Sequence, residues 1–127
     1  MAALLVALGG ALGTLARYGL RLALMGAEGD VGVLGTFLAN VVGSFALGVV
    51  VETCAGRSLA GTDLRLILGV GVLGGFTTYS SFNLEAIELA RQGDLARAGG
   101  YVVATAAVCL VAGFLGLALG RAMRGAT

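Results

Sequence analysis

The stretch GVGVLGGFTTYSSF, residues 69–82, interrupts an otherwise apolar segment with four glycines and a run of hydroxyl side chains. Because glycine weakens a helix and permits unusual backbone angles, the stretch predicts a local helix break. In a bilayer, a break persists only where protein, water or an ion satisfies the freed N–H and C=O groups. A break would therefore mark a functional site. The alternative is that Gly71 and Gly75 let another helix approach closely, while the hydroxyls bond back to their own turn.

The composition predicts an integral membrane protein. The 127 residues are 58% hydrophobic and 12% charged, with a mean hydropathy of +1.00, which is far too apolar for a soluble domain of this size. A net charge of +1 argues against a nucleic-acid partner. There is no histidine, and Cys54 and Cys109 sit singly in different apolar segments, so no catalytic or zinc-binding cluster is predicted. Each cysteine is interpreted as a small buried hydrophobe.

Four apolar segments are predicted to cross the membrane as one domain that covers residues 1–127. A helix needs about 20 residues to cross a core of roughly 30 Å, and the segments run over residues 4–24, 33–51, 64–90 and 98–119. The third is longer than a straight crossing requires, so it is predicted to be broken near residues 74–77 or strongly tilted. Turns are predicted at 26–32, 52–63 and 91–97. Four crossings place both termini on the same side.

Two segments carry polar stripes with a four-residue spacing, which places their members on one helix face. The second segment has Thr36, Asn40, Ser44 and Gly48, and the last has Tyr101, Thr105, Cys109 and Gly113. Such a stripe can be an interhelical seam, where an asparagine hydrogen-bonds a neighbour for about 0.6 kcal/mol. It can equally be a pore wall or ion site, because an amide at mid-membrane is costly and usually faces protein or water.

Arg17 and the Gly9/Gly13 pair stand out in the first segment. The glycines offer a face for close helix packing. Arg17 has two interpretations: its side chain snorkels to the interface, or it faces a wet vestibule and attracts an anion there.

The third segment continues after its glycines with an aromatic pair, Tyr79 and Phe82, which share a helix face. Such pairs are typical of packing, but this one lies among hydroxyls. Glu85 and Glu88 follow and are interpreted as interfacial charges at the point where the helix leaves the membrane.

The arginines are almost evenly divided between the two predicted sides. On the side with the termini lie Arg57, Arg65, Arg121 and Arg124, and on the opposite side lie Arg21, Arg91 and Arg97. Orientation normally follows a clear excess on the cytoplasmic side. The small difference permits insertion in either direction, and hence antiparallel pairing of two copies, unless other features select one orientation.

Three motifs resemble those of the Fluc (CrcB) family of bacterial fluoride channels. They are GGALGTLARY at 9–18, GTFLANVVGSFALG at 35–48, and GGFTTYSSF at 74–82 followed by Glu85. The resemblance covers nearly the whole chain, and the third motif is highly specific. One departure is clear, since the family usually has phenylalanine where this chain has Tyr79. Serine and threonine also vary in the family at the positions of Ser81 and Thr105.

The resemblance implies an all-α protein of four transmembrane helices with a broken third helix, which assembles as an antiparallel, dual-topology homodimer in the bacterial inner membrane. It implies two pores that passively release fluoride, and a structural sodium ion (Na+) at the dimer centre, held by backbone carbonyls of Gly74 and Thr77. Carried over by motif, the pore-lining pair is Tyr79 and Phe82. The pathway is completed by Asn40, by the vestibule residue Arg17, and by the hydroxyls of Thr36, Ser80, Ser81, Tyr101 and Thr105.

The chemistry of these side chains suits a small, strongly hydrated anion. A pore must replace lost water with donors without forming too deep a trap, and hydroxyls and the Asn40 amide are such donors. Aromatic edges are weakly positive and can face an anion without a full charge. A central cation on carbonyl oxygens would satisfy acceptors exposed by the break and raise the local positive potential.

Three other functions compete with this hypothesis. A small four-span multidrug exporter needs a carboxylate within the membrane to exchange protons for a cationic drug, and Glu52 is the nearest candidate. A membrane assembly subunit would use the stripes only for packing. An enzyme is not expected, because no acid–base pair or nucleophile with a partner lies within a span.

Overall fold

A computed structural model describes residues 1–25 and 31–126. Most of the predicted turn at 26–32 lies outside the described residues. The elements are α1 (Ala2–Ala23), α2 (Val31–Thr53), β1 (Ser58–Leu59), β2 (Thr62–Asp63), the π-helix η1 (Leu66–Leu73), α3 (Gly74–Phe76), α4 (Tyr79–Arg91) and α5 (Leu95–Gly125). The protein is thus an all-α membrane protein with a broken third helical element, apart from a small hairpin of two strands with two residues each, which the sequence reasoning did not anticipate.

Three helices of the described chain are long and apolar enough to cross a membrane: Ala2–Ala23, Gly32–Thr53 and Leu95–Gly125. The last begins earlier and ends later than the predicted segment 98–119. Its early start has a local cause, because the Asp94 side chain accepts a hydrogen bond of 3.0 Å from the backbone N–H of Arg97 and caps the first turn. The third apolar segment is divided among η1, α3 and α4, so it does not form one continuous helix.

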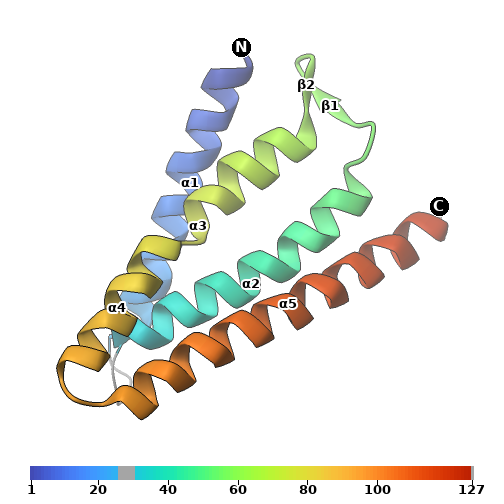
Figure 1. The fold of residues 1–127 in the computed structure, drawn as a ribbon. Helices are drawn as coiled ribbons and strands as arrows, with labels where there is room; N and C mark the ends of the chain where they lie inside the picture. Colours follow the sequence, from blue (N-terminus) through green and yellow to red (C-terminus); the bar gives the residue numbers. More distant parts are fainter. Residues whose placement is uncertain (26–30, 127) are drawn as a thin grey trace.

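The helices form two packed groups that meet at the broken element. In one, α1 lies against η1 and α3; in the other, α5 lies against α2 and α4. Figure 1 shows these groups diverging from the end of the molecule that carries the α4–α5 connection. Both termini lie toward the opposite end, where the hairpin is.

Glycines make both groups close-packed. A Cβ added at Gly13 of α1 would collide with the Val72 carbonyl of η1, and one at Gly75 would collide with the Gly10 carbonyl. Between α2 and α5, a Cβ on Gly48 would come within 2.5 Å of the Gly113 carbonyl oxygen. The close-packing role predicted for Gly13 is therefore confirmed, and Gly75 and Gly48 also allow their backbones to touch a neighbouring helix.

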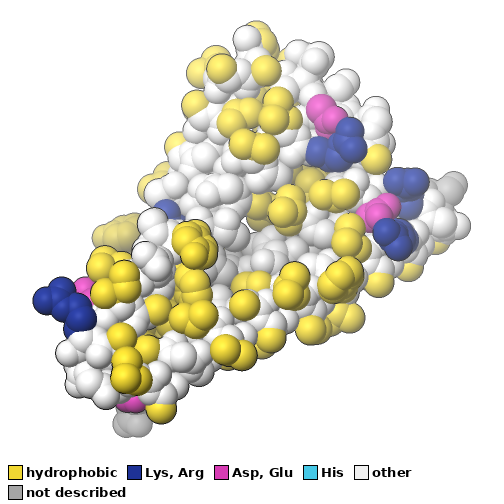
Figure 2. Space-filling model, in the orientation of Figure 1, with side chains coloured by type: hydrophobic (Ala, Val, Ile, Leu, Met, Phe, Trp, Pro, Cys, Tyr) yellow, Lys and Arg dark blue, Asp and Glu magenta, His cyan; other side chains and the backbone are white. Residues whose placement is uncertain are grey.

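The surface is apolar along the helices and charged at their ends. Figure 2 shows hydrophobic side chains over the shafts of the helices and charged groups gathered toward the two ends. At the hairpin end Arg65 pairs with Asp63 at 2.7 Å. Hydrogen bonds from the Arg65 side chain and backbone lower the pKa of the Asp63 carboxyl. This distribution matches a protein surrounded by lipid between two aqueous faces.

Candidate functional site

The helix break lies at Thr77 and Thr78. Thr77 has φ −80° and ψ 157°, and Thr78 has φ −152° and ψ 115°, so both are extended. The extended backbone begins at Thr77, within the predicted range 74–77, and continues to Thr78, so the predicted break is confirmed. Gly74 and Gly75 stay helical, and Gly75 packs against Gly10 of α1.

Asn40 pairs with both freed backbone groups of Thr78. The Thr78 N–H donates to Asn40 Oδ1 at 2.8 Å, and Asn40 Nδ2 donates to the Thr78 carbonyl at 3.1 Å. A carboxamide presents the same donor and acceptor as a peptide group. The side chain on α2 thus replaces the partners that a continuous helix would have supplied, as a break inside a membrane requires.

The Thr78 side chain restarts the helix as the N-cap of α4. Its Oγ1 accepts from the Ser81 N–H at 3.2 Å. The hydroxyls of Ser80 and Ser81 also lie 3.2 Å from this oxygen. The predicted hydroxyl run is therefore a connected cluster at the start of α4.

The carbonyls before the break differ in their partners. Thr77 donates to the Leu73 carbonyl from both its N–H and its hydroxyl, each at 2.9 Å. The Gly75 carbonyl accepts from Arg17 Nε at 3.3 Å and from the Thr14 hydroxyl at 3.5 Å. Within residues 1–25 and 31–126, no hydrogen-bond donor reaches the carbonyl of Gly74 or of Thr77.

Arg17 is consequently directed at the break. Its side chain is half-buried against α3, where it donates to the last turn of the helix that ends at Phe76. A cation at a helix C-terminus is favourable because the unpaired carbonyls there carry partial negative charge. This contact differs from the snorkelling interpretation, in which the Arg17 side chain would extend to the membrane interface.

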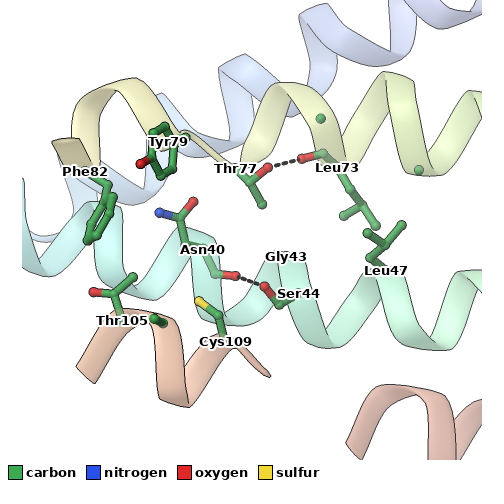
Figure 3. Close-up of a pocket in the computed structure, with 13 residues that line it drawn as sticks. Asn40, Gly43, Ser44, Leu47, Leu73, Thr77, Tyr79, Phe82, Thr105 and Cys109 are labelled. Carbon is green, nitrogen blue, oxygen red and sulfur yellow. Dashed lines mark hydrogen bonds between the residues drawn. The ribbon is translucent and has the colours of Figure 1, made fainter. Parts of the chain in front are cut away.

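A cavity of about 400 Å³ lies beside the break. Figure 3 shows it between the broken element, α2 and α5. The predicted site residues that line it are Asn40, Gly74, Thr77, Tyr79, Phe82 and Thr105, together with Gly43, Ser44, Leu47, Gly69, Leu73, Ala106 and Cys109. None of the lining residues is charged. Thr36, Ser80, Ser81, Tyr101 and Arg17 do not line it.

The aromatic side chains form a tilted series next to the cavity. The ring of Phe82 lies 5.6 Å from that of Tyr79 at an interplanar angle of 51°, and 5.2 Å from that of Tyr101 at 56°. Tyr101 is buried, whereas Tyr79 is 77% exposed. Tilted packing turns ring edges, which are weakly positive, toward neighbouring groups.

Glu85 joins three helices at the far side of this series. Its Oε1 accepts from the Thr36 hydroxyl of α2 at 2.7 Å, and its Oε2 accepts from the Tyr101 hydroxyl of α5 at 2.8 Å. The interpretation of Glu85 as a simple interfacial charge was therefore wrong. The stripes on the second and last segments bring two hydroxyls to one carboxylate, which sequence spacing within single helices could not reveal.

The α5 wall of the cavity carries Thr105 and Cys109. Thr105 is 5% exposed, and its hydroxyl has no hydrogen-bond partner among the described residues. Cys54 is buried as predicted, but Cys109 is half-buried and lines the cavity, so its interpretation as a buried hydrophobe was wrong. Ser44 and Cys109 belong to the polar stripes that were interpreted as a packing seam or a pore wall, but neither was included in the predicted ion pathway.

The fold and the site together define a multi-pass α-helical membrane protein with an uncharged cavity at a helix break. The chain belongs to the CrcB family: residues 4–117 match the family model described as "CrcB-like protein, Camphor Resistance (CrcB)". This confirms the resemblance seen in the three motifs.

Close relatives cover almost the whole chain, and each is named "Fluoride-specific ion channel FluC". The protein of Anaeromyxobacter sp. (strain K) is 48% identical over 122 residues, which are 96% of this chain and 97% of the relative. That of Agrobacterium fabrum (strain C58 / ATCC 33970) is 46% identical over 117 residues, 92% of this chain and 94% of the relative. That of Sorangium cellulosum (strain So ce56) is 47% identical over 116 residues, 91% of each.

Proposed function

We propose that this protein is a fluoride-selective channel that passively releases fluoride from the cytoplasm across the bacterial inner membrane and so limits fluoride toxicity. The observation that carries the proposal is the cavity at the helix break, whose uncharged wall combines an amide, hydroxyls and aromatic rings. Uncharged donors replace part of an anion's hydration without binding it too tightly to leave. The names of the relatives point to the same ion.

The pathway in this proposal begins with the residues that line the cavity. Phe82 and Tyr79 present ring edges to the ion, while Asn40 and Thr105 supply donors; the unpartnered Thr105 hydroxyl supports this role. The remaining hydroxyls of the proposed pathway are those of Ser80 and Ser81 on α4, Tyr101 on α5 and Thr36 on α2; in the single chain those of Tyr101 and Thr36 donate to Glu85. Arg17 lies outside the cavity wall and attracts the anion toward the vestibule while it binds the Gly75 carbonyl.

The proposed assembly is an antiparallel homodimer with two pores. A single chain leaves apolar side chains uncovered on every long helix, and it leaves Tyr79 of the cavity 77% exposed. A second copy would cover part of that surface and close the cavity around the ring. The near balance of arginines between the two ends permits the opposite orientation that such pairing requires.

A structural sodium ion at the dimer centre is part of the same proposal. The carbonyl oxygens of Gly74 and Thr77 are hard donors without a hydrogen-bond partner among the described residues, so they fit a hard monovalent cation. When bound, the ion would supply a fixed positive charge beside an anion pathway. The chain's own contribution is to hold these carbonyls free by pairing Thr78 with Asn40.

Fluoride release from liposomes tests the proposed function. Purified protein is reconstituted, and efflux is read with a fluoride electrode beside a chloride control. Fast fluoride release with negligible chloride release would support a selective channel. No release from a verified folded dimer would contradict it.

The structure does not favour a drug–proton exporter. Glu52, the carboxylate considered for that chemistry, lies at the end of α2 and pairs with Arg121 at 2.9 Å and with Arg124 at 3.5 Å. A paired carboxylate at a helix end is poorly suited to bind protons and cations alternately. If the liposomes release no fluoride, drug–proton exchange is the next assay, and the stripes would then be packing seams of an exporter or an assembly subunit.

A further inference from the structure

Gly43 is the point at which α2 touches the first side chain of the break. It is buried on α2 and lies about one turn after Asn40. A Cβ added at Gly43 would collide with the Cγ2 methyl of Thr77, whereas the next nearest atoms, Phe76 Cδ1 and Thr77 Cβ, would lie at 3.5 and 3.7 Å. Figure 3 shows the Thr77 side chain extending from the broken element toward Gly43. The space left by the missing side chain of Gly43 is therefore occupied by one methyl group.

The Thr77 side chain cannot turn away from α2 without losing a hydrogen bond. Its hydroxyl and its backbone N–H both donate to the Leu73 carbonyl, each at 2.9 Å. Because threonine is branched at Cβ, its methyl and its hydroxyl move together about χ1. A rotation that clears the methyl from an added Cβ would take the hydroxyl away from the Leu73 carbonyl. Otherwise the backbone of Thr77 must shift.

The backbone at Thr77 determines where an open carbonyl points. The Thr78 N–H donates to Asn40 Oδ1 at 2.8 Å, and the described peptide bonds include none in the cis form. In a trans peptide group the N–H and the C=O point in opposite directions. The Thr77 carbonyl is therefore directed away from the Asn40 amide, and no donor among the described residues reaches it. A shift of Thr77 would redirect this oxygen.

We propose that Gly43 is a positioning residue for a cation ligand, the Thr77 carbonyl. Its lack of a Cβ lets the Thr77 methyl lie against α2, so Thr77 keeps both bonds to Leu73 while its carbonyl faces away from Asn40. Asn40 and Gly43 thus fix the peptide group between Thr77 and Thr78 together, the first by hydrogen bonds and the second by space. This inference rests on the proposed structural sodium ion, which takes oxygen ligands.

A double-variant cycle tests this role through sodium-dependent stability. The thermal midpoint of the detergent-solubilised protein is measured while sodium chloride replaces N-methyl-D-glucamine chloride at constant ionic strength, since a bound ion raises the midpoint. For Gly43→Ala we expect a lower midpoint without sodium, and half of the rise should need a sodium concentration at least about tenfold higher. Thr77→Ser removes only the colliding methyl and keeps the hydroxyl, so this variant should respond to sodium as the unchanged protein does.

The combination of Gly43→Ala with Thr77→Ser distinguishes positioning from general destabilisation. Without the methyl, the nearest atom to the added Cβ is Phe76 Cδ1 at 3.5 Å, which is an ordinary contact. The sodium response should therefore return in the double variant, because the two changes are coupled through one contact. Gly35→Ala is the matched control on the same helix, since the nearest atom to its added Cβ is Leu24 Cδ1 at 3.8 Å. It should leave the midpoint and the sodium response unchanged.

The outcomes separate this role from the sodium ion and from the channel. A double variant as insensitive to sodium as Gly43→Ala, or an unchanged sodium response in Gly43→Ala itself, would overturn the proposal. If the unchanged protein shows no response to sodium, the structural sodium ion fails, and with it the assignment of Gly43 to a cation ligand. Fluoride release from liposomes tests the channel separately, and its result does not enter these midpoints.

Discussion

Asn40 has two tasks at the level of single residues. Its carbonyl oxygen and one amide N–H are engaged by Thr78, so it holds the break in place. Asn40 also lines the cavity, and in the proposed function the second N–H of its amide is the donor offered to the anion. A carboxamide can do both because it has two donor hydrogens and an acceptor.

The substitution Asn40→Asp tests both tasks, because it removes the amide donor and keeps the size of the side chain. A carboxylate still accepts from the Thr78 N–H, but it places a negative oxygen beside the Thr78 carbonyl and removes the donor. We expect destabilisation of about 1–3 kcal/mol, measured as a lower thermal midpoint of the detergent-solubilised protein, and loss of fluoride release. Asn83→Asp makes the same chemical change at an exposed position of α4 and should leave both quantities unchanged. An unchanged thermal midpoint for Asn40→Asp would contradict the role of Asn40 in holding the break.

Phe82 lies between the rings of Tyr79 and Tyr101 and lines the cavity. Phe82→Ile keeps much of the apolar volume but removes the aromatic edge. Fluoride release should be abolished, while size-exclusion chromatography should still show the same folded species as the unchanged protein. Normal release would mean that the ring only packs.

Tyr79 carries a hydroxyl at a position where the resemblance to fluoride channels leads us to expect phenylalanine. The side chain is 77% exposed, and none of the described residues forms a hydrogen bond with its hydroxyl. Tyr79→Phe keeps the ring and its contact with Phe82, so release should stay within about threefold of the original, which corresponds to well under 1 kcal/mol. A complete loss would show that the hydroxyl belongs to the pathway.

At the level of elements, the broken helix was only partly predictable from the sequence. Glycines in the stretch 69–82 correctly indicated an irregular segment that packs closely on α1. The glycines did not indicate which side chain holds the break, because Thr78 pairs with Asn40, which is 38 residues away. Glu85 was misjudged for the same reason, since its two partners come from other helices.

Gly13→Ala tests the packing of α1 on the broken element. The new Cβ would collide with the Val72 carbonyl, and backbone cannot move aside as a side chain does. We expect a loss of about 1–3 kcal/mol from overpacking, seen as a lower thermal midpoint and a smaller monodisperse peak.

Gly19→Ala is the matched control on the same helix, because nothing lies within 4 Å of its added Cβ. Alanine is about 0.5–1 kcal/mol better than glycine in a helix, so this variant should be neutral or more stable. Equal destabilisation of both variants would rule out a specific contact.

At the level of the whole molecule, the charged ends decide how the chain can enter the membrane. Arg57, Arg65, Arg121 and Arg124 lie toward the hairpin end, while Arg91 and Arg97 flank the α4–α5 connection. The excess of about one that was counted from sequence is small beside the excess that normally fixes orientation. Sequence alone could predict this balance, because it depends on segment order and not on side-chain contacts.

Replacing Arg91 and Arg97 by glutamine should force one orientation. The change raises the arginine excess at the terminal side from one to three, by the counts given above. A reporter fused to the C-terminus should then shift from both sides of the membrane to the cytoplasmic side, and fluoride release should be lost. The double change to lysine retains the charge and should preserve both. Unchanged reporter distribution in the glutamine variant would contradict dual topology.

The pairing of Asn40 with Thr78 has a consequence for the order of biogenesis. The groups that hold the break open come from α2, so the third segment has no partner for an interrupted backbone until α2 lies beside it. Before that contact, hydrogen bonding within the segment favours an unbroken helix, since lipid offers no substitute. We therefore expect the third segment to bend only after insertion, when α2 has come to lie beside it.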